Sequence, residues 1–155
     1  MLMSTLRLVA VIMGTAAIAW AADDPLVGTW KLNVSKSKFT PGPAPQEETR
    51  VYEAQAEGIN VTVKTIEADG HTATMHISAN YDGKDYPVTG DPNTDTRSYK
   101  KVNDHTLAFA NKKGDKVTIS GRGVVSADGK SRTVTISGTD SKGKKFTSTA
   151  VYDKQ

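Results

Sequence analysis

Cysteine is absent from this chain of 155 residues. The absence excludes disulfide bonds, thiolate metal centres and a cysteine nucleophile, so a folded domain must rely on its own hydrophobic core. The glycine-x-serine-x-glycine elbow of serine hydrolases is also missing, as is any motif that forces two carboxylates together. The sequence therefore gives little support to an enzyme and favours a non-catalytic protein.

One long hydrophobic run is present, at the N-terminus. A single positive charge at Arg7 precedes an uncharged apolar stretch, Leu8–Ala19, which ends in the small residues of Ala19-Trp20-Ala21. This stretch is too short to span a bilayer comfortably, and its end fits an A-x-A cleavage site. We therefore expect residues 1–21 to be a cleaved signal peptide, with an uncleaved N-terminal anchor as the alternative. Residues 22–155 then form a single domain, which is long enough to build a core without covalent links.

The same run constrains the compartment and the partners. Because no cysteine follows it, a lipid-anchored protein is not expected, and the mature chain should be free in the periplasm or outside the cell. Removing Arg7 with the leader leaves 19 basic against 17 acidic side chains, a net charge of +2. The lysines stand beside turn residues and form no stripe with aromatic residues, which argues against nucleic acid as a partner.

Helical periodicity is lacking throughout the mature chain, and apolar residues alternate with polar ones instead. Alternation with a period of two is typical of half-buried β-strands, so the fold class is expected to be all-β with no substantial helix. The expected strands are Thr29–Asn33, Glu48–Gln55, Ile59–Glu67, Thr72–Tyr81, Lys84–Val88, Thr96–Val102, Thr106–Asn111, Lys116–Val125, Ser131–Gly138 and Lys145–Asp153.

Short turns separate these strands at regular intervals. Asp69-Gly70, Asp82-Gly83 and Asp128-Gly129 supply the positive φ that tight hairpins need, so each strand should pair with the next. An antiparallel up-and-down meander of this length is expected to curl and close into an 8–10-stranded β-barrel, which removes its exposed edges. One segment, residues 34–46, has three prolines and no periodicity. It is expected to be a loop that either caps one barrel mouth with Phe39 or forms a plain surface connection.

The start of the first strand carries a recognisable pattern. Gly28 would let the chain turn in closely, and Trp30 would then lie across one end of the core as a plug. The segment L-V-G-T-W-K-L resembles the glycine-x-tryptophan signature of lipocalins and calycins, particularly small bacterial lipocalin-like proteins, and T-A-V-Y-D-K resembles the last strand of fatty-acid-binding proteins. The resemblance implies a barrel that holds a small apolar or amphipathic ligand.

The chain also departs from these families. Where fatty-acid-binding proteins carry two short helices, it has the proline-rich loop. Where they carry an arginine two residues before the final tyrosine, it has Ala150 before Tyr152. The carboxylate clamp of that family therefore cannot be transferred to this chain. The glycine-rich continuation of haem-binding nitrobindins is also missing, and we expect no cofactor.

Alternation along the strands indicates which side chains face inward. The inward set is expected to include Val61, Val63, Leu107, Phe109, Val117, Ile119, Val134, Ile136, Phe146 and Ala150. Within it we expect a ligand space lined by Met75, Ile77, Phe109, Ile119, Ile136 and Phe146, with the Tyr152 hydroxyl available for orientation. Room for the ligand would come from Ala73, Ala79, Ala150, Gly121 and Gly123. The glycines can equally mark sharply bent strands around a packed interior.

Metal binding has no support in the sequence. His71 and His76 fall on opposite faces of one strand, and Thr96 and Val102 stand where a calcium loop starting at Asp91 would need glycine and glutamate. Arg122 is expected on the outer wall, although a role as a ligand anchor is conceivable. Three function classes remain: a barrel that binds a small ligand, an envelope or interaction module with a packed barrel, and an enzyme indicated by titratable residues gathered at one mouth. The oligomeric state stays open.

Overall fold

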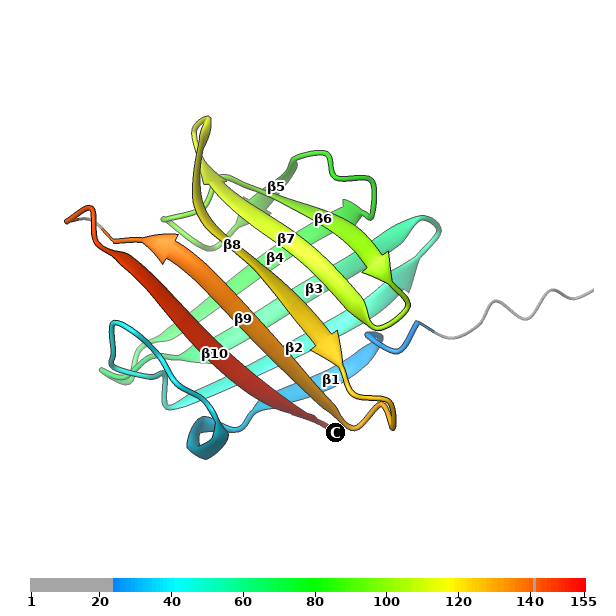
Figure 1. Cartoon of the computed structure of the whole chain (residues 1–155), viewed down its shortest axis with the longest axis horizontal. Helices are drawn as coiled ribbons and strands as arrows, with labels where there is room; N and C mark the ends of the chain where they lie inside the picture. The colour runs from blue at the N-terminus through cyan, green and yellow to red at the C-terminus, as the bar shows by residue number, and fades with distance from the viewer. Residues whose placement is uncertain (1–23, 141) are drawn as a thin grey trace, which may run out of the picture.

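Ten antiparallel strands build the protein in a computed structural model that describes residues 24–140 and 142–155 (Figure 1). The strands are β1 (Gly28–Leu32), β2 (Glu47–Gln55), β3 (Gly58–Ile66), β4 (Thr72–Asn80), β5 (Tyr86–Thr89), β6 (Thr96–Asn103), β7 (Thr106–Lys113), β8 (Lys116–Val125), β9 (Ser131–Thr139) and β10 (Lys145–Lys154). The helical structure of the described residues is one short 3₁₀ turn, Val34–Lys36, so the all-β expectation is confirmed. The expected signal peptide lies outside the described residues.

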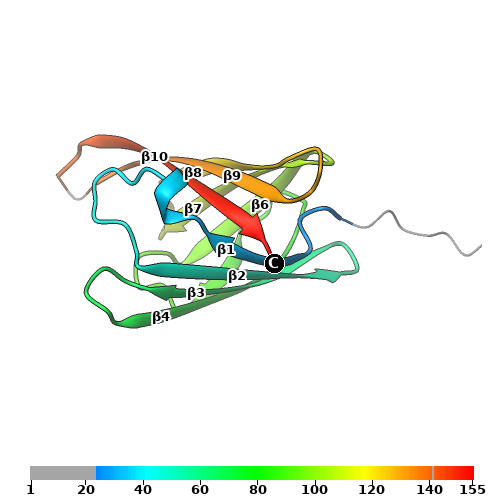
Figure 2. The same cartoon turned by 90° about the horizontal axis from the view of Figure 1, so that it is seen from below.

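Each strand pairs with the next, and the meander closes on itself. β1 pairs with β2 on one side and with β10 on the other, where Leu32 lies opposite Tyr152. The expected closed barrel is thereby confirmed, and every strand has two neighbours. Viewed from the side, the barrel is flattened, with β2, β3 and β4 in one wall and β8 and β9 in the other (Figure 2). No helix in the described part of the chain is long and apolar enough to cross a membrane.

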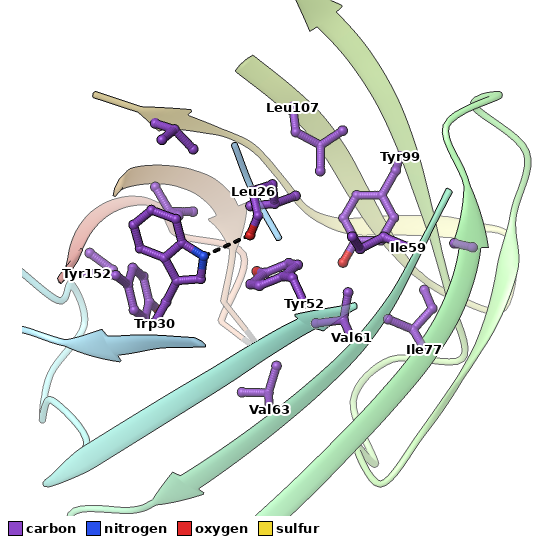
Figure 3. Close-up of a cluster of buried hydrophobic side chains, with 14 of the residues drawn as sticks. Leu26, Trp30, Tyr52, Ile59, Val61, Val63, Ile77, Tyr99, Leu107 and Tyr152 are labelled. Carbon is purple, nitrogen blue, oxygen red and sulfur yellow. Dashed lines mark hydrogen bonds between the residues drawn. The ribbon is translucent and has the colours of Figure 1, made fainter. Parts of the chain in front are cut away.

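The end of the barrel near the N-terminal segment, residues 24–27, is filled by large side chains (Figure 3). Trp30, which the sequence assigned to this end, has no exposed surface, and its indole Nε1 donates a hydrogen bond to the Leu26 carbonyl at 2.8 Å. Tyr52 and Tyr152 are each 2% exposed beside it. Gly28 adopts φ +132°, a backbone conformation that other residues rarely adopt, so the entry into β1 favours glycine. This packing closes one end of the barrel.

The proline-rich loop runs beside β10. Lys38 exchanges two backbone hydrogen bonds with Thr149, and the Ser148 hydroxyl donates to the Thr40 carbonyl at 3.0 Å. Phe39 is half-buried and packs against the hydrophobic core. The loop therefore continues the wall of the barrel beyond β1.

The register of β8 differs from the expectation at one position. Asn111 lies opposite Ile119 and Lys112 opposite Val117, which leaves Thr118 as an extra residue in a β-bulge. Because a bulge reverses the alternation, Val117 is 50% exposed, and the expectation that it faces the core was wrong. Ile119 and the residues after it keep the expected alternation.

Candidate functional site

A cavity of about 480 Å³ opens at the barrel end opposite the N-terminal segment. The turn between β3 and β4 and the turn between β5 and β6 border its mouth, contributing His71 and Asp91. Its apolar wall consists of Val63, Ala73, Met75, Phe109, Ile119, Val134 and Ile136. The cavity thus lies between β3 and β4 on one side and β7, β8 and β9 on the other, and its size is within the range of small-molecule sites.

The structure brings part of the expected ligand-binding set together. Met75, Phe109, Ile119 and Ile136 line the cavity. Three other residues of the set do not line it: Ile77 is 4% exposed and packs in the core, Phe146 packs beside Gly138, and Tyr152 is buried towards the closed end. These three residues pack around the cavity. The alternation of the strands predicts which face of a strand a residue is on, but not how far along the barrel axis it lies.

The room inside the barrel has a different origin from the one expected. Of the five small residues thought to leave space, only Ala73 lines the cavity. A Cβ at Gly121 would lie 2.9 Å from the Phe109 ring, and one at Gly123 would lie 2.5 Å from the Arg132 guanidinium. These glycines therefore accommodate large neighbouring side chains and do not provide the ligand space.

An ion pair on β2 forms the first polar part of the cavity wall. The Nε group of Arg50 donates to Oε1 of Glu48 at 2.5 Å, and the Tyr152 hydroxyl donates to the same oxygen at 2.7 Å. Thr65 donates to Oε2 at 3.3 Å. Burial disfavours the charge of Glu48, but Arg50 and these hydrogen bonds outweigh burial and lower the pKa of the carboxyl group. Glu48 is therefore ionised and neutralises the charge of Arg50.

The same interactions act on Tyr152. Burial raises the pKa of its hydroxyl; the charge of Arg50 opposes this effect, and the charge of Glu48 and the hydrogen bond to it raise the pKa further. The Arg50 guanidinium also lies 5.0 Å from the centre of the Tyr152 ring. Tyr152 consequently remains a neutral donor whose hydroxyl is committed to Glu48.

A second guanidinium, that of Arg97 on β6, also lines the cavity. Its Nε donates to Oδ1 of Asn111 at 2.6 Å, and its Nη1 donates to the Tyr99 hydroxyl at 3.2 Å. The group lies 5.4 Å from the centre of the Phe109 ring. Arg97 is only 8% exposed, yet no acidic side chain in residues 24–140 or 142–155 lies within ion-pair distance of it. Burying the positive charge of a guanidinium is costly unless a negative group lies beside it.

A third guanidinium lies deeper, towards the closed end. Nη1 of Arg132 on β9 donates to the Tyr52 hydroxyl at 2.5 Å, and its Nε is buried without a hydrogen-bond partner among the described residues. Burial disfavours ionisation of Tyr52, but the charges of Arg132 and Arg50 prevail and lower the pKa of its hydroxyl to about 8. Arg132 and Tyr52 are each 2% exposed.

Sequence reasoning missed these three arginines, although the alternation of the strands carried a signal for them. Arg132 precedes Val134 and Ile136 at intervals of two, and Arg97 precedes Tyr99 at the same interval. Each therefore shares the inner face with apolar residues. In contrast, Arg122, the arginine that the sequence analysis considered, is exposed on the outer wall.

Titratable groups also gather at the mouth, the arrangement that would indicate an enzyme. Glu67, His71 and Asp91 border the cavity, and Nδ1 of His71 lies 2.5 Å from Oδ1 of Asp69. The side chains of this pair are 64% and 71% exposed, so water competes with any reactant there. His76, on the outer face, contacts the Thr62 hydroxyl instead. Within the described residues, no three potential ligands form a metal-binding group.

Comparison with known proteins supports the fold alone. No family model and no curated protein matches the chain. Among solved structures, it resembles zebrafish ileal bile acid-binding protein complexed with cholic acid, with a TM-score of 0.51 and 8% identity over 84% of this chain and 99% of that one. Together with the ten closed strands, this likeness shows that the two chains share a closed β-barrel fold.

Proposed function

We propose that the protein reversibly binds one small amphipathic acid in the cavity of the barrel. The observation that carries the proposal is the Arg97 guanidinium, which lines a cavity of about 480 Å³ and has no carboxylate partner among residues 24–140 and 142–155. Because Glu48 neutralises Arg50, Arg97 is the uncompensated cation of the cavity wall. A ligand with a single negative charge would complete its environment.

The remaining surface of the cavity suits the apolar part of such a ligand. Met75, Phe109, Ile119 and Ile136 present hydrocarbon and aromatic surface to it. Arg97 is held by Asn111 on one side and by aromatic rings beneath it, so the ligand's acid group would meet a pre-oriented donor. The solved barrel that resembles this chain was complexed with cholic acid, which is consistent with a ligand of this class.

The location of the protein belongs to the same proposal. We propose that residues 1–21 are a cleaved leader and that the mature lipocalin-like protein is free in the periplasm or outside the cell; the apolar run Leu8–Ala19 and the small residues that end it support this location. A structural or interaction module with a packed, ligand-free barrel is the alternative, and the open cavity argues against it.

Titration with a medium-chain fatty acid and with its neutral methyl ester tests the function. Competition against an environment-sensitive apolar dye should show that the wild-type protein binds the acid at least about tenfold more tightly, because a charge-assisted hydrogen bond contributes about 1.5–3 kcal/mol. Arg97→Met should bind acid and ester equally. Arg122→Met is the matched control, since it removes an exposed arginine from the outer wall, and it should behave as the wild type.

A second variant tests the need for cavity space independently of the Arg97 charge. Ala73→Phe places a ring in the cavity and should abolish binding of both acid and ester. Failure of the wild type to bind either compound would overturn the proposal, and equal acid affinity in wild type and Arg97→Met would overturn the role of Arg97.

A further inference from the structure

The charges inside the barrel do not balance. Among the described residues, the interior holds three guanidiniums, those of Arg50, Arg97 and Arg132, against the single carboxylate of Glu48. Glu48 is paired with Arg50. The proposed ligand would compensate Arg97, which leaves Arg132 at the closed end. A cation that is 2% exposed needs a negative group of its own.

The group in contact with Arg132 is the phenol of Tyr52. Nη1 of Arg132 lies 2.5 Å from the Tyr52 oxygen, and the guanidinium lies 4.9 Å from the centre of the same ring. Gly123 also lies close to the guanidinium, because a Cβ at this position would be 2.5 Å from Nη2. Arg132 is thus held against Tyr52, and loss of the phenolic proton would supply the missing negative charge.

Tyr52 is also connected to the ligand cavity. Glu48, Arg50 and Tyr52 follow one another at intervals of two along the inner face of β2, and the first two line the cavity. Arg50 therefore lies between the cavity and Tyr52, and its charge acts on both.

We infer that Tyr52 takes up a proton when the cavity binds an anion, so that the ligand affinity depends on pH through this residue. The inference rests on the proposed function, because it requires an anionic ligand. A bound anion weakens the positive potential that favours the phenolate, and linkage requires that the phenolate weaken anion binding to the same extent.

The other groups around Tyr52 fit this assignment. Arg132 from β9 and Arg50 from β2 lower the pKa of Tyr52 to about 8 against the effect of burial. Tyr152 from β10 and Tyr81 after β4 have pKa values raised by burial and by their hydrogen bonds to Glu48 and Asp24.

Two further polar side chains of the interior, Tyr99 and Arg97 on β6, are hydrogen-bonded to each other. The lowered pKa of Tyr52 places its proton exchange in the mildly alkaline range.

Titration of a medium-chain alkyl sulfate, whose own charge is constant above neutral pH, tests the inference. The wild-type affinity should fall about three- to tenfold between about pH 7 and 9, in line with a group that titrates near 8. Tyr52→Phe should bind with little dependence on pH. Tyr86→Phe is the matched control, because the Tyr86 hydroxyl donates to the exposed Asp82 and, among the described residues, is hydrogen-bonded to none of the interior arginines. This variant should keep the wild-type pH profile.

A spectroscopic measurement keeps the test decisive if Tyr52→Phe folds poorly. The tyrosinate absorbance of the free wild-type protein should show one of its five tyrosines titrating near pH 8, and saturating alkyl sulfate should move that step upwards. Binding with a flat pH profile, or an absorbance step that the ligand does not move, would overturn this inference and leave the proposed function standing. Absence of binding at every pH would overturn both.

Discussion

Truncation of Trp30 tests the packing at the closed end of the barrel. The indole has no exposed surface, and Trp30→Ala would leave a cavity between β1 and the neighbouring side chains of Leu26 and Tyr152 (Figure 3). Replacement of a buried tryptophan by alanine destabilises proteins by about 3–5 kcal/mol through lost apolar transfer and the cavity left behind. The Leu26 carbonyl would also lose its hydrogen bond from Nε1, which adds about 1 kcal/mol.

Trp30→Phe separates these two contributions. It keeps an aromatic ring in the core but removes the Nε1 donor, so it should destabilise the protein by about 1–2 kcal/mol, less than half the effect of alanine. Urea unfolding followed by circular dichroism measures both variants, and equal slopes with shifted midpoints would show that the native state itself has lost stability. The wild-type tryptophan emission should be blue-shifted and poorly quenched by acrylamide.

The outcome that would refute the reasoning is small destabilisation. If Trp30→Ala unfolds within about 1 kcal/mol of the wild type, the closed end can collapse around the missing ring, and the indole does not plug the barrel. A water-like emission maximum of the native protein would lead to the same conclusion.

Four further outcomes are expected. Gly123→Ala should destabilise the fold by about 1–3 kcal/mol in thermal unfolding, because its Cβ would lie 2.5 Å from the Arg132 guanidinium; unchanged stability would contradict this contact. Glu48 has a lowered pKa, so its contribution to stability should be present above about pH 4.3 and lost as the pH falls through its lower folded-state value, and Glu48→Gln should flatten this acid limb. Tyr52 also has a lowered pKa, so stability should rise by up to about 2–3 kcal/mol as the pH increases from about 8 to 10, a rise that Tyr52→Phe should abolish. Mass spectrometry of the exported protein should find a chain that begins at Ala22 or Asp23, whereas the intact form in the membrane fraction would support the anchor.

Most of the fold could be predicted because the strands are amphipathic and the turns carry strong local signals. The expected strands agree with the observed ones to within a few residues, as with Thr106–Asn111 and the observed β7, Thr106–Lys113. The bulge at Thr118 could not be predicted in this way. Its extra residue is specified by pairing with β7, and neither Val117 nor Ile119 differs locally from a regular strand residue.

The site was predictable on its apolar side only. Met75 and Phe109 were found because they alternate with polar residues, whereas Ile77 satisfies the same pattern but lies too deep. The interior arginines were missed because charged residues are usually exposed. Arg97 is held by Asn111, its partner across the β6–β7 hairpin, and by Tyr99, two residues along the same strand.

The pairing of β1 with β10 has a consequence for how the chain reaches its native state. Asn33 and Asp153, which share a hydrogen bond of 2.8 Å beside this seam, are 120 positions apart in the sequence. During synthesis, β1 must therefore wait for its second partner until β10 has emerged, while the earlier hairpins can already form. Pairing over such a separation is slow, and the waiting sheet exposes two unpaired edges that invite association with other chains. A chaperone that protects the nascent meander should consequently be needed until β10 is complete, and any chain that lacks β10 should aggregate instead of forming a smaller barrel.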